Sequence, residues 1–264
     1  MWKTWNLPRN EGTRMHRFGD AAICVAVDSA GEGSVLAAMA LYAPELPSKA
    51  ARGGREAPVA LPPLSSPSWT RSYAGGAETY ELLPGYPPIP VCVRLRESFR
   101  LSPGSGLDGW IFSKLEARVS VNGSELGSFP LRLPFKTLYG IPQAGVVCRY
   151  DEADFLSSRE SVMETLHADP ALIAHPVSLR NSSQEPVQVT DLCIYGEQLS
   201  IFSIGTRLVS EALHFNFSAS GVRMSMDGHG SLPPGATLVA KPRVSGEERF
   251  IERSFELFKA MTRI

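Results

Sequence analysis

The residues with the clearest potential for chemistry lie in FKTLYGIPQAGVVCRYDEADF, residues 135–155. Gly140 and Gly145 are separated by four residues, the opening spacing of a phosphate-binding P-loop. A P-loop continues with Lys and then Ser or Thr at the start of a helix, so that the lysine reaches the phosphates. Here two valines follow Gly145, and VVCRY has the character of a strand. The sequence therefore argues against a nucleotide site and favours a tight strand-to-strand corner at GIPQAG.

Two cations and two phenols surround this corner. Together with the two glycines they form the candidate ligand-binding set: Lys136, Tyr139, Gly140, Gly145, Arg149 and Tyr150. Such side chains can bind an anion jointly with the backbone N–H groups of a turn. The structural alternative is that the cations pair with the acids after Tyr150 and that the tyrosines pack the corner, and we favour it.

The structural alternative makes two further predictions. Gly140 or Gly145 adopts a backbone conformation that would strain a β-branched residue. In the strand that follows, Val147 lies on the opposite face from Val146 and Cys148, and Arg149 shares the face of Val147. If that face is buried, Arg149 must be hydrogen-bonded there.

Other motifs give no chemistry. GSGLDG at 104–109 matches G-x-G-x-x-G, but no room remains for a helix before the next hairpin, so we interpret it as a surface turn. No nucleophile elbow occurs, and the five histidines lack metal-binding spacing. The acids at 151–154 suit a solvated helix start as well as general acid–base work. We therefore predict no metal, no cofactor and no catalytic residue.

The four cysteines lie far apart, each in an apolar run, and no C-x-x-C occurs. They are Cys24, Cys92, Cys148 and Cys193. We expect four buried thiols. Two disulfides are the alternative in an oxidising or hyperthermophilic setting.

The composition excludes several classes of protein. Hydrophobic residues make up 43% and charged residues 20% of 264, which is typical of a folded, soluble chain. The net charge of -1 gives no electrostatic footprint for nucleic acid. No apolar run is long enough to span a membrane, and no signal-peptide core follows the first methionine. We expect a cytoplasmic location.

The elements that must position the candidate site are mainly strands. Prolines and glycines divide the chain into short pieces, and alternating segments separated by turns predict an all-β, β-sandwich-like fold of two packed halves. Asn122-Gly123 predicts a type I′ hairpin. A helix is expected over 151–169, and a short C-terminal helix after a capping box at Ser245. We place the halves at 1–140, with a Pro-rich loop at about 44–70, and at 141–264.

The corner segment also carries a family resemblance. FKTLYGIPQAGVVCRY resembles the signature of the prokaryotic, largely archaeal family called domain of unknown function 432, with its K-x-x-L-Y-G followed by G-x-x-C-R-Y. LPPLSSPSW, LEARVSVNGSELGSFPL and VSLRNSSQEPVQVTDLCIYG look similar to the family's pattern too, so the resemblance covers about Pro58 to Gly196. It implies a β-rich intracellular protein and supplies no activity, cofactor or catalytic residue.

The function expected from these features is that of a non-enzymatic binding or assembly module, because β-sandwiches present loops and edges. Both a protein partner and self-association are compatible with such edges. The alternative is a small anionic-ligand-binding protein, or an enzyme, with its site at the Lys136–Tyr150 corner. A concave pocket lined by Lys136, Tyr139 and Arg149 would favour the alternative.

Overall fold

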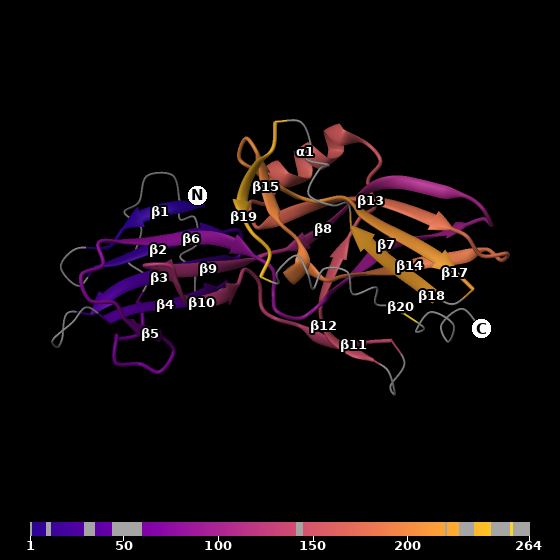
Figure 1. Ribbon diagram of the computed structural model, residues 1–264. Helices are drawn as coiled ribbons and strands as arrows, with labels where there is room; N and C mark the ends of the chain where they lie inside the picture. The colour runs from indigo at the N-terminus through magenta and orange to yellow at the C-terminus, as the bar shows by residue number, and fades with distance from the viewer. Residues whose placement is uncertain are drawn as a thin grey trace. The chain divides into compact units, whose positions relative to one another are not determined.

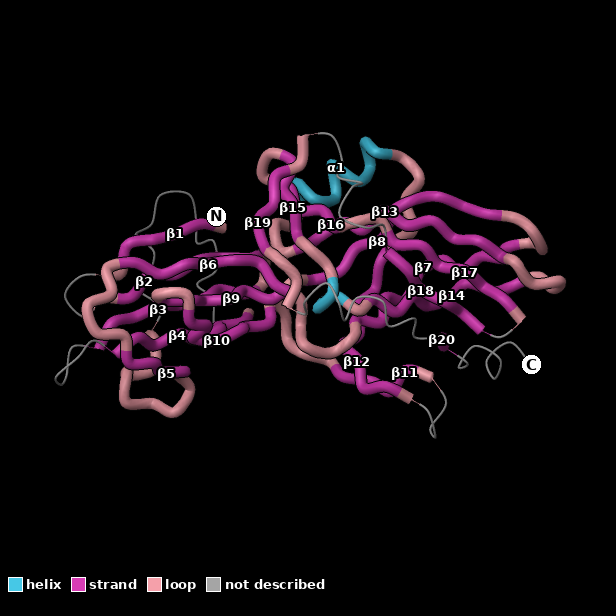
Figure 2. The backbone as a smooth tube through the Cα atoms, viewed as in Figure 1, coloured by secondary structure: helices cyan, strands magenta, loops and turns pink. Residues whose placement is uncertain are grey.

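The protein is all-β and sandwich-like, with strands dominating its computed structural model (Figures 1 and 2). The structure describes residues 2–8, 12–28, 35–43, 60–140, 145–219, 221–226, 235–243 and 254–255. Within these ranges the chain forms two compact units, and each unit is built from two sheets. Unit 1 comprises Met1–Gly85 and Leu115–Leu133, and unit 2 comprises Tyr86–Lys114 and Pro134–Ile264. The boundary expected at residue 140 falls inside unit 2.

Unit 1 contains two antiparallel sheets. One has the order β1 (Lys3–Asn6), β6 (Thr79–Gly85), β9 (Glu116–Val121), β10 (Ser124–Pro130). The other has the order β2 (Thr13–Phe18), β3 (Ala21–Asp28), β4 (Val35–Tyr42), β5 (Thr70–Tyr73). The core includes Phe18, Ile23, Leu36, Tyr80 and Leu82.

The predicted Asn-Gly hairpin joins β9 to β10. Asn122 has φ 49° and Gly123 has φ 78°, so both central residues take the left-handed backbone that a type I′ turn requires. Val121 and Ser124 pair directly across the turn. The hairpin prediction is confirmed.

Unit 2 contains two mixed sheets. The first has the order β11 (Lys136–Tyr139), β12 (Val146–Ala153), β7 (Val91–Leu101), β14 (Val187–Ile194), and β12 runs parallel to β7. The second has the order β19 (Thr237–Ala240), β15 (Ile201–Ile204), β16 (Arg207–Ser210), β13 (Leu172–Asn181), β17 (Leu213–Ser218), β18 (Gly221–Met226), β20 (Ser254–Phe255), with β8 (Gly106–Lys114) paired to β13.

The helices of the described chain are short. They are α1 (Arg159–Ala168) and a 3₁₀ turn, Gly196–Gln198. The helix expected over 151–169 begins later than predicted, because Asp151–Ala153 extend β12 and pair with Val93–Leu95 of β7. Sheet pairing thus outweighs the preference of acidic residues for a helix start. In α1, Val162 and Leu166 are buried, four residues apart on one helix face.

The expected C-terminal helix falls mostly outside the described residues. The two residues described in its range, Ser254–Phe255, form β20 and pair with Val222 and Arg223 of β18. At these two positions the structure has a strand and not a helix. The 104–109 motif is a turn only at its start, since β8 begins at Gly106.

Candidate functional site

The candidate site is built on the antiparallel pair β11–β12, which frames the corner at 140–145. In the register of this pair Thr137 lies opposite Cys148 and Tyr139 lies opposite Val146, so these side chains share one face. Tyr150 lies on that face too, two residues beyond Cys148.

The two cations of the predicted set lie on the other face. Lys136 pairs directly with Arg149, and Leu138 pairs with Val147. Lys136 is exposed and Arg149 is buried, at 2% exposure. The predicted alternation along VVCRY, with Arg149 on the face of Val147, is confirmed. The structure therefore keeps the phenols together and separates them from the cations.

Gly140 follows β11 directly and has φ 101°, in the region that favours glycine. The prediction of such a backbone at Gly140 or Gly145 is therefore confirmed at Gly140. Residues 141–144, the middle of the corner, lie outside the described residues.

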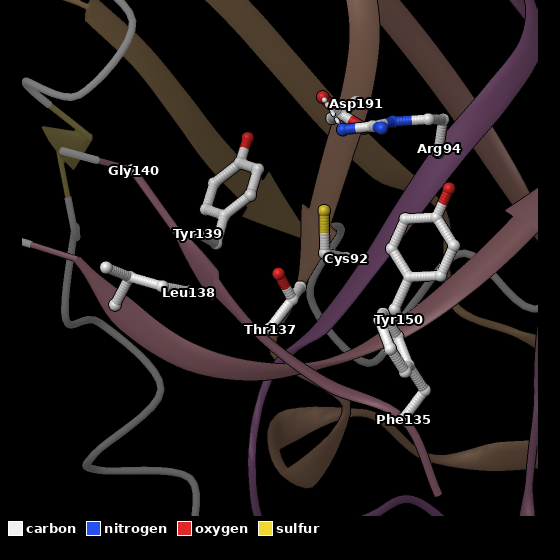
Figure 3. Close-up of a pocket in the computed structure, with 9 residues that line it drawn as sticks. All are labelled: Cys92, Arg94, Phe135, Thr137, Leu138, Tyr139, Gly140, Tyr150 and Asp191. Atoms are coloured by element: carbon white, nitrogen blue, oxygen red, sulfur yellow. Dashed lines mark hydrogen bonds and ion pairs between the residues drawn. The ribbon is translucent and has the colours of Figure 1, made fainter. Parts of the chain in front are cut away.

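A pocket of about 490 Å³ opens on the phenol face of this sheet (Figure 3). This volume lies in the usual range for small-molecule sites. The pocket is lined by Cys92, Arg94, Phe135, Thr137, Leu138, Tyr139, Gly140, Tyr150 and Asp191. Three of the predicted residues, Tyr139, Gly140 and Tyr150, belong to this set.

The cation of the pocket is Arg94 of β7. Its Nε donates to Asp191 Oδ1 at 2.8 Å, and its Nη2 donates to Asp191 Oδ2 at 3.3 Å. Asp191 of β14 stands directly opposite Arg94 and is buried, whereas the Arg94 side chain is 54% exposed. The bidentate contact holds the guanidinium plane at a fixed angle over the sheet.

Aromatic rings form much of the remaining wall. The Arg94 guanidinium lies 5.5 Å from the ring centre of Tyr150, within cation–π distance. Phe135 meets Tyr150 edge to face at 5.6 Å. The Tyr150 hydroxyl donates to Glu152 at 2.9 Å. In Figure 3 the hydroxyls of Tyr139 and Tyr150 and the Cys92 sulfur point to the same side of the sheet as the Arg94–Asp191 pair.

Four titratable groups of the lining favour their protonated forms. Burial raises the pKa of Tyr139 well above its usual range. Partial burial, together with the bond to Glu152, raises the pKa of Tyr150. The pKa of Cys92 is raised by its hydrogen bond to Cys148 and by burial. Asp191 raises the pKa of Arg94, which keeps the guanidinium charged. At neutral pH these groups can donate hydrogen bonds and are poor nucleophiles.

Sequence reasoning missed Arg94, Asp191 and Cys92. A signal existed for two of them, because Cys92 and Arg94 are alternate residues in VCVRLRESFRL and must share a face. Asp191 gave no local signal. It joins the site only through the pairing of β14 with β7, across 97 residues of sequence.

A second polar cluster lies sealed within unit 2. His175 receives or donates hydrogen bonds at both ring nitrogens, Nε2 to Ser113 Oγ and Nδ1 to Ser210 Oγ, each at 2.9 Å. All three residues are buried, at 0–1% exposure. Burial lowers the pKa of His175 to about 3, so the ring is neutral. Because a substrate has no access to these buried side chains, we interpret the cluster as a structural hydrogen-bond network in the interior of unit 2.

In the described part of the chain, no three His, Cys, Asp or Glu side chains are arranged to hold a metal ion. None of the helices described here combines the length and apolarity needed to cross a membrane.

Comparison with known proteins gives a match to a protein family. The model of a family described as "Protein of unknown function (DUF432)" matches residues 1–260. This range includes the first fifty residues, which lie outside the resemblance seen in the sequence. No curated protein and no solved structure matches the chain.

Proposed function

Because the chain belongs to the DUF432 family, whose description assigns no function, we propose a function from the pocket: a non-enzymatic module that binds a small organic ligand. The observation that carries the proposal is the combination of a pocket of about 490 Å³ with an oriented guanidinium and three aromatic side chains in its lining. Aromatic walls combined with a few placed polar groups are typical of sites that orient small ligands.

The polar groups favour a ligand that presents an acceptor oxygen. A guanidinium carries five N–H donors. Nε and Nη2 of Arg94 are directed at Asp191, and the side chain is 54% exposed, so its remaining N–H donors are accessible to a ligand. A carboxylate suits this geometry, and an aromatic body suits the walls formed by Phe135, Tyr139 and Tyr150.

Binding is favoured over catalysis by the protonation states of the lining. A nucleophile or general base needs a pKa near the working pH. The pKa values of Tyr139 and Cys92 are instead raised, and both Asp191 oxygens are engaged by Arg94. The groups that face a ligand are therefore suited to hold it.

The test is a binding screen with small aromatic carboxylates, such as benzoate and its hydroxylated derivatives, and with the matching amides. Saturation-transfer NMR on the full chain reports binding. We expect carboxylates to bind more tightly than their amides, and Arg94→Lys to weaken the carboxylates by about tenfold, because a lysine cannot keep the bidentate geometry.

Lys136→Gln is the matched control, since it removes a cation from the opposite face of the same sheet. It should leave carboxylate affinity unchanged. If Arg94→Lys and Lys136→Gln lowered carboxylate affinity equally, the pocket would be rejected as the binding site. The same conclusion would follow if neither Arg94→Lys nor Tyr139→Phe changed the affinity of the ligands found in the screen.

A further inference from the structure

Arg94 is flanked by an acidic residue on each neighbouring strand. Asp191 of β14 is its direct partner in the antiparallel pair β14–β7, and Glu152 of β12 is its direct partner in the parallel pair β12–β7. Directly opposed residues project from the same face of a sheet. The pocket face of this sheet therefore carries a charged row, formed by Asp191, Arg94 and Glu152, with two negative charges and one positive charge.

The two acids of the charged row differ in what they can still bind. Asp191 is buried, and its oxygens accept hydrogen bonds from Nε and Nη2 of Arg94 and from the hydroxyl of Thr190. Glu152 is exposed, and its Oε1 accepts from the hydroxyl of Tyr150, a residue of the pocket lining, at 2.9 Å. A carboxylate has about four sites that accept hydrogen bonds. Glu152 is therefore the acid that can receive a donor from a ligand in the pocket.

The charges of the row decide which ligand matches it. A ligand whose only charge is a carboxylate meets Arg94 and, on the adjacent strand, the like charge of Glu152. A ligand that carries a carboxylate and an ammonium on one carbon meets an opposite charge at both places. Adjacent strands lie about 4.8 Å apart, so two groups joined through a single carbon can lie beside neighbouring residues of the row. Such charge matching gives specificity.

We propose that the ligand of the pocket is an aromatic α-amino acid. Its carboxylate accepts hydrogen bonds from Arg94, its ammonium donates to Glu152, and its ring lies against the aromatic side chains of the pocket lining (Figure 3). This inference rests on the proposed function, because it uses the same pocket and the same guanidinium. It adds the second charged group of the ligand and the residue that selects it.

The experiment compares phenylalanine with two molecules that each lack one of its charged groups. 3-Phenylpropionate keeps the skeleton and the carboxylate without the ammonium, and phenethylamine keeps the ammonium without the carboxylate. Titrations of the full chain followed by ¹H–¹⁵N NMR measure each affinity. We expect phenylalanine to bind about fivefold more tightly than 3-phenylpropionate, at the upper end of the range for an exposed ion pair. Phenethylamine should bind least tightly, because it has no group for Arg94.

Glu152→Gln removes the acid that selects the ammonium. This variant should lower the affinity for phenylalanine about fivefold and leave the affinity for 3-phenylpropionate unchanged or higher. Asp154→Asn is the matched control, because it removes the same charge from an exposed residue two positions farther along the chain, where Asp154 is paired with Arg96. In the control, the ratio of the two affinities should stay close to that of the wild type.

Two results would overturn this inference and leave the proposed function intact. One is phenylalanine binding no more tightly than 3-phenylpropionate while both depend on Arg94. The other is a Glu152→Gln variant that lowers both affinities equally, because Glu152 would then only hold Tyr150 in place. If Arg94→Lys changed neither affinity, the inference and the proposed function would fail together.

Discussion

At the residue scale, the structure distinguishes two ion pairs on the same strand. Arg94 and Arg96 both belong to β7, and each contacts one aspartate, Asp191 and Asp154 respectively. Asp191 is buried, at 3% side-chain exposure, whereas Asp154 is 51% exposed. An unpaired buried carboxylate loses much of its solvation, whereas an exposed one is stabilised by water.

Arg94→Ala should therefore destabilise the protein more than Arg96→Ala. We expect a loss of about 1–3 kcal/mol for Arg94→Ala, moderated by the exposure of the arginine itself, and about 0–1 kcal/mol for Arg96→Ala. Urea denaturation monitored by circular dichroism measures both. Equal losses would show that burial of Asp191 does not set the strength of its pair.

His175 makes stability depend on pH. Its pKa is lowered from 6.5 to about 3 by burial, so between these pH values the unfolded chain binds a proton that the folded chain does not. The contribution of neutral His175 to the free energy of unfolding is complete above pH 6.5. Below pH 6.5 it decreases by about 1.4 kcal/mol for each pH unit. NMR of the imidazole should show a neutral ring down to pH 5. A His175 resonance that titrates near pH 6.5 in the folded protein would contradict the sealed environment.

At the scale of elements, the hairpin β11–β12 depends on the backbone of Gly140. With φ 101°, this position strains any residue that carries a Cβ. Gly140→Ala should lower the free energy of unfolding by about 1–3 kcal/mol. Gly75→Ala is the control, because Gly75 lies in a turn with open space around its Cβ position and without a left-handed φ. Thermal unfolding compares the two. A Gly140→Ala protein as stable as Gly75→Ala would mean that the hairpin tolerates another turn.

The alternation of residue types along the sequence predicted much about each strand, but little about which strands pair with it. The period of two identified the strand after the corner and the face of each residue along it, because alternation is a property of a single strand. It could have separated Arg149 from Tyr150 at the outset, since adjacent residues point to opposite faces. The partners of β12 were not predictable in this way: β7 lies more than fifty residues upstream, and the pairing is parallel. Asp191 reaches the site by a similarly distant pairing. The structure was therefore needed to identify Arg94 and Asp191 as the cation and the acid of the pocket.

At the scale of the whole molecule, the chain moves between units more than once. It passes from unit 1 to unit 2 after Gly85, returns at Leu115, and leaves again after Leu133. A single division near residue 140 was the simplest interpretation of the sequence, because a turn-rich corner resembles a linker. The segment of unit 2 that contains β7 and β8 could not be recognised from composition, since the composition of its strands is similar to that of the strands on either side.

This connectivity predicts which fragment folds. Gly85, the last residue of β6, pairs directly with Glu116 at the start of β9. A short turn such as Asn-Gly can therefore connect residue 85 to residue 115 and convert β6 and β9 into a hairpin. We expect a chain of residues 1–85 joined in this way to 115–133 to fold by itself, because it retains every strand of both unit 1 sheets.

The fragment 1–140 should behave differently, although it is longer and contains no artificial junction. It retains β7 and β8 but lacks β12, β14 and β13, the strands with which they pair. Unpaired strands expose backbone N–H and C=O groups and promote aggregation. Size-exclusion chromatography and ¹H–¹⁵N NMR should show a dispersed, monomeric spectrum for the joined chain and aggregation for 1–140. If 1–140 were well dispersed and the joined chain disordered, unit 1 would depend for its folding on residues 86–114, and the division into two compact units would not describe how the protein folds.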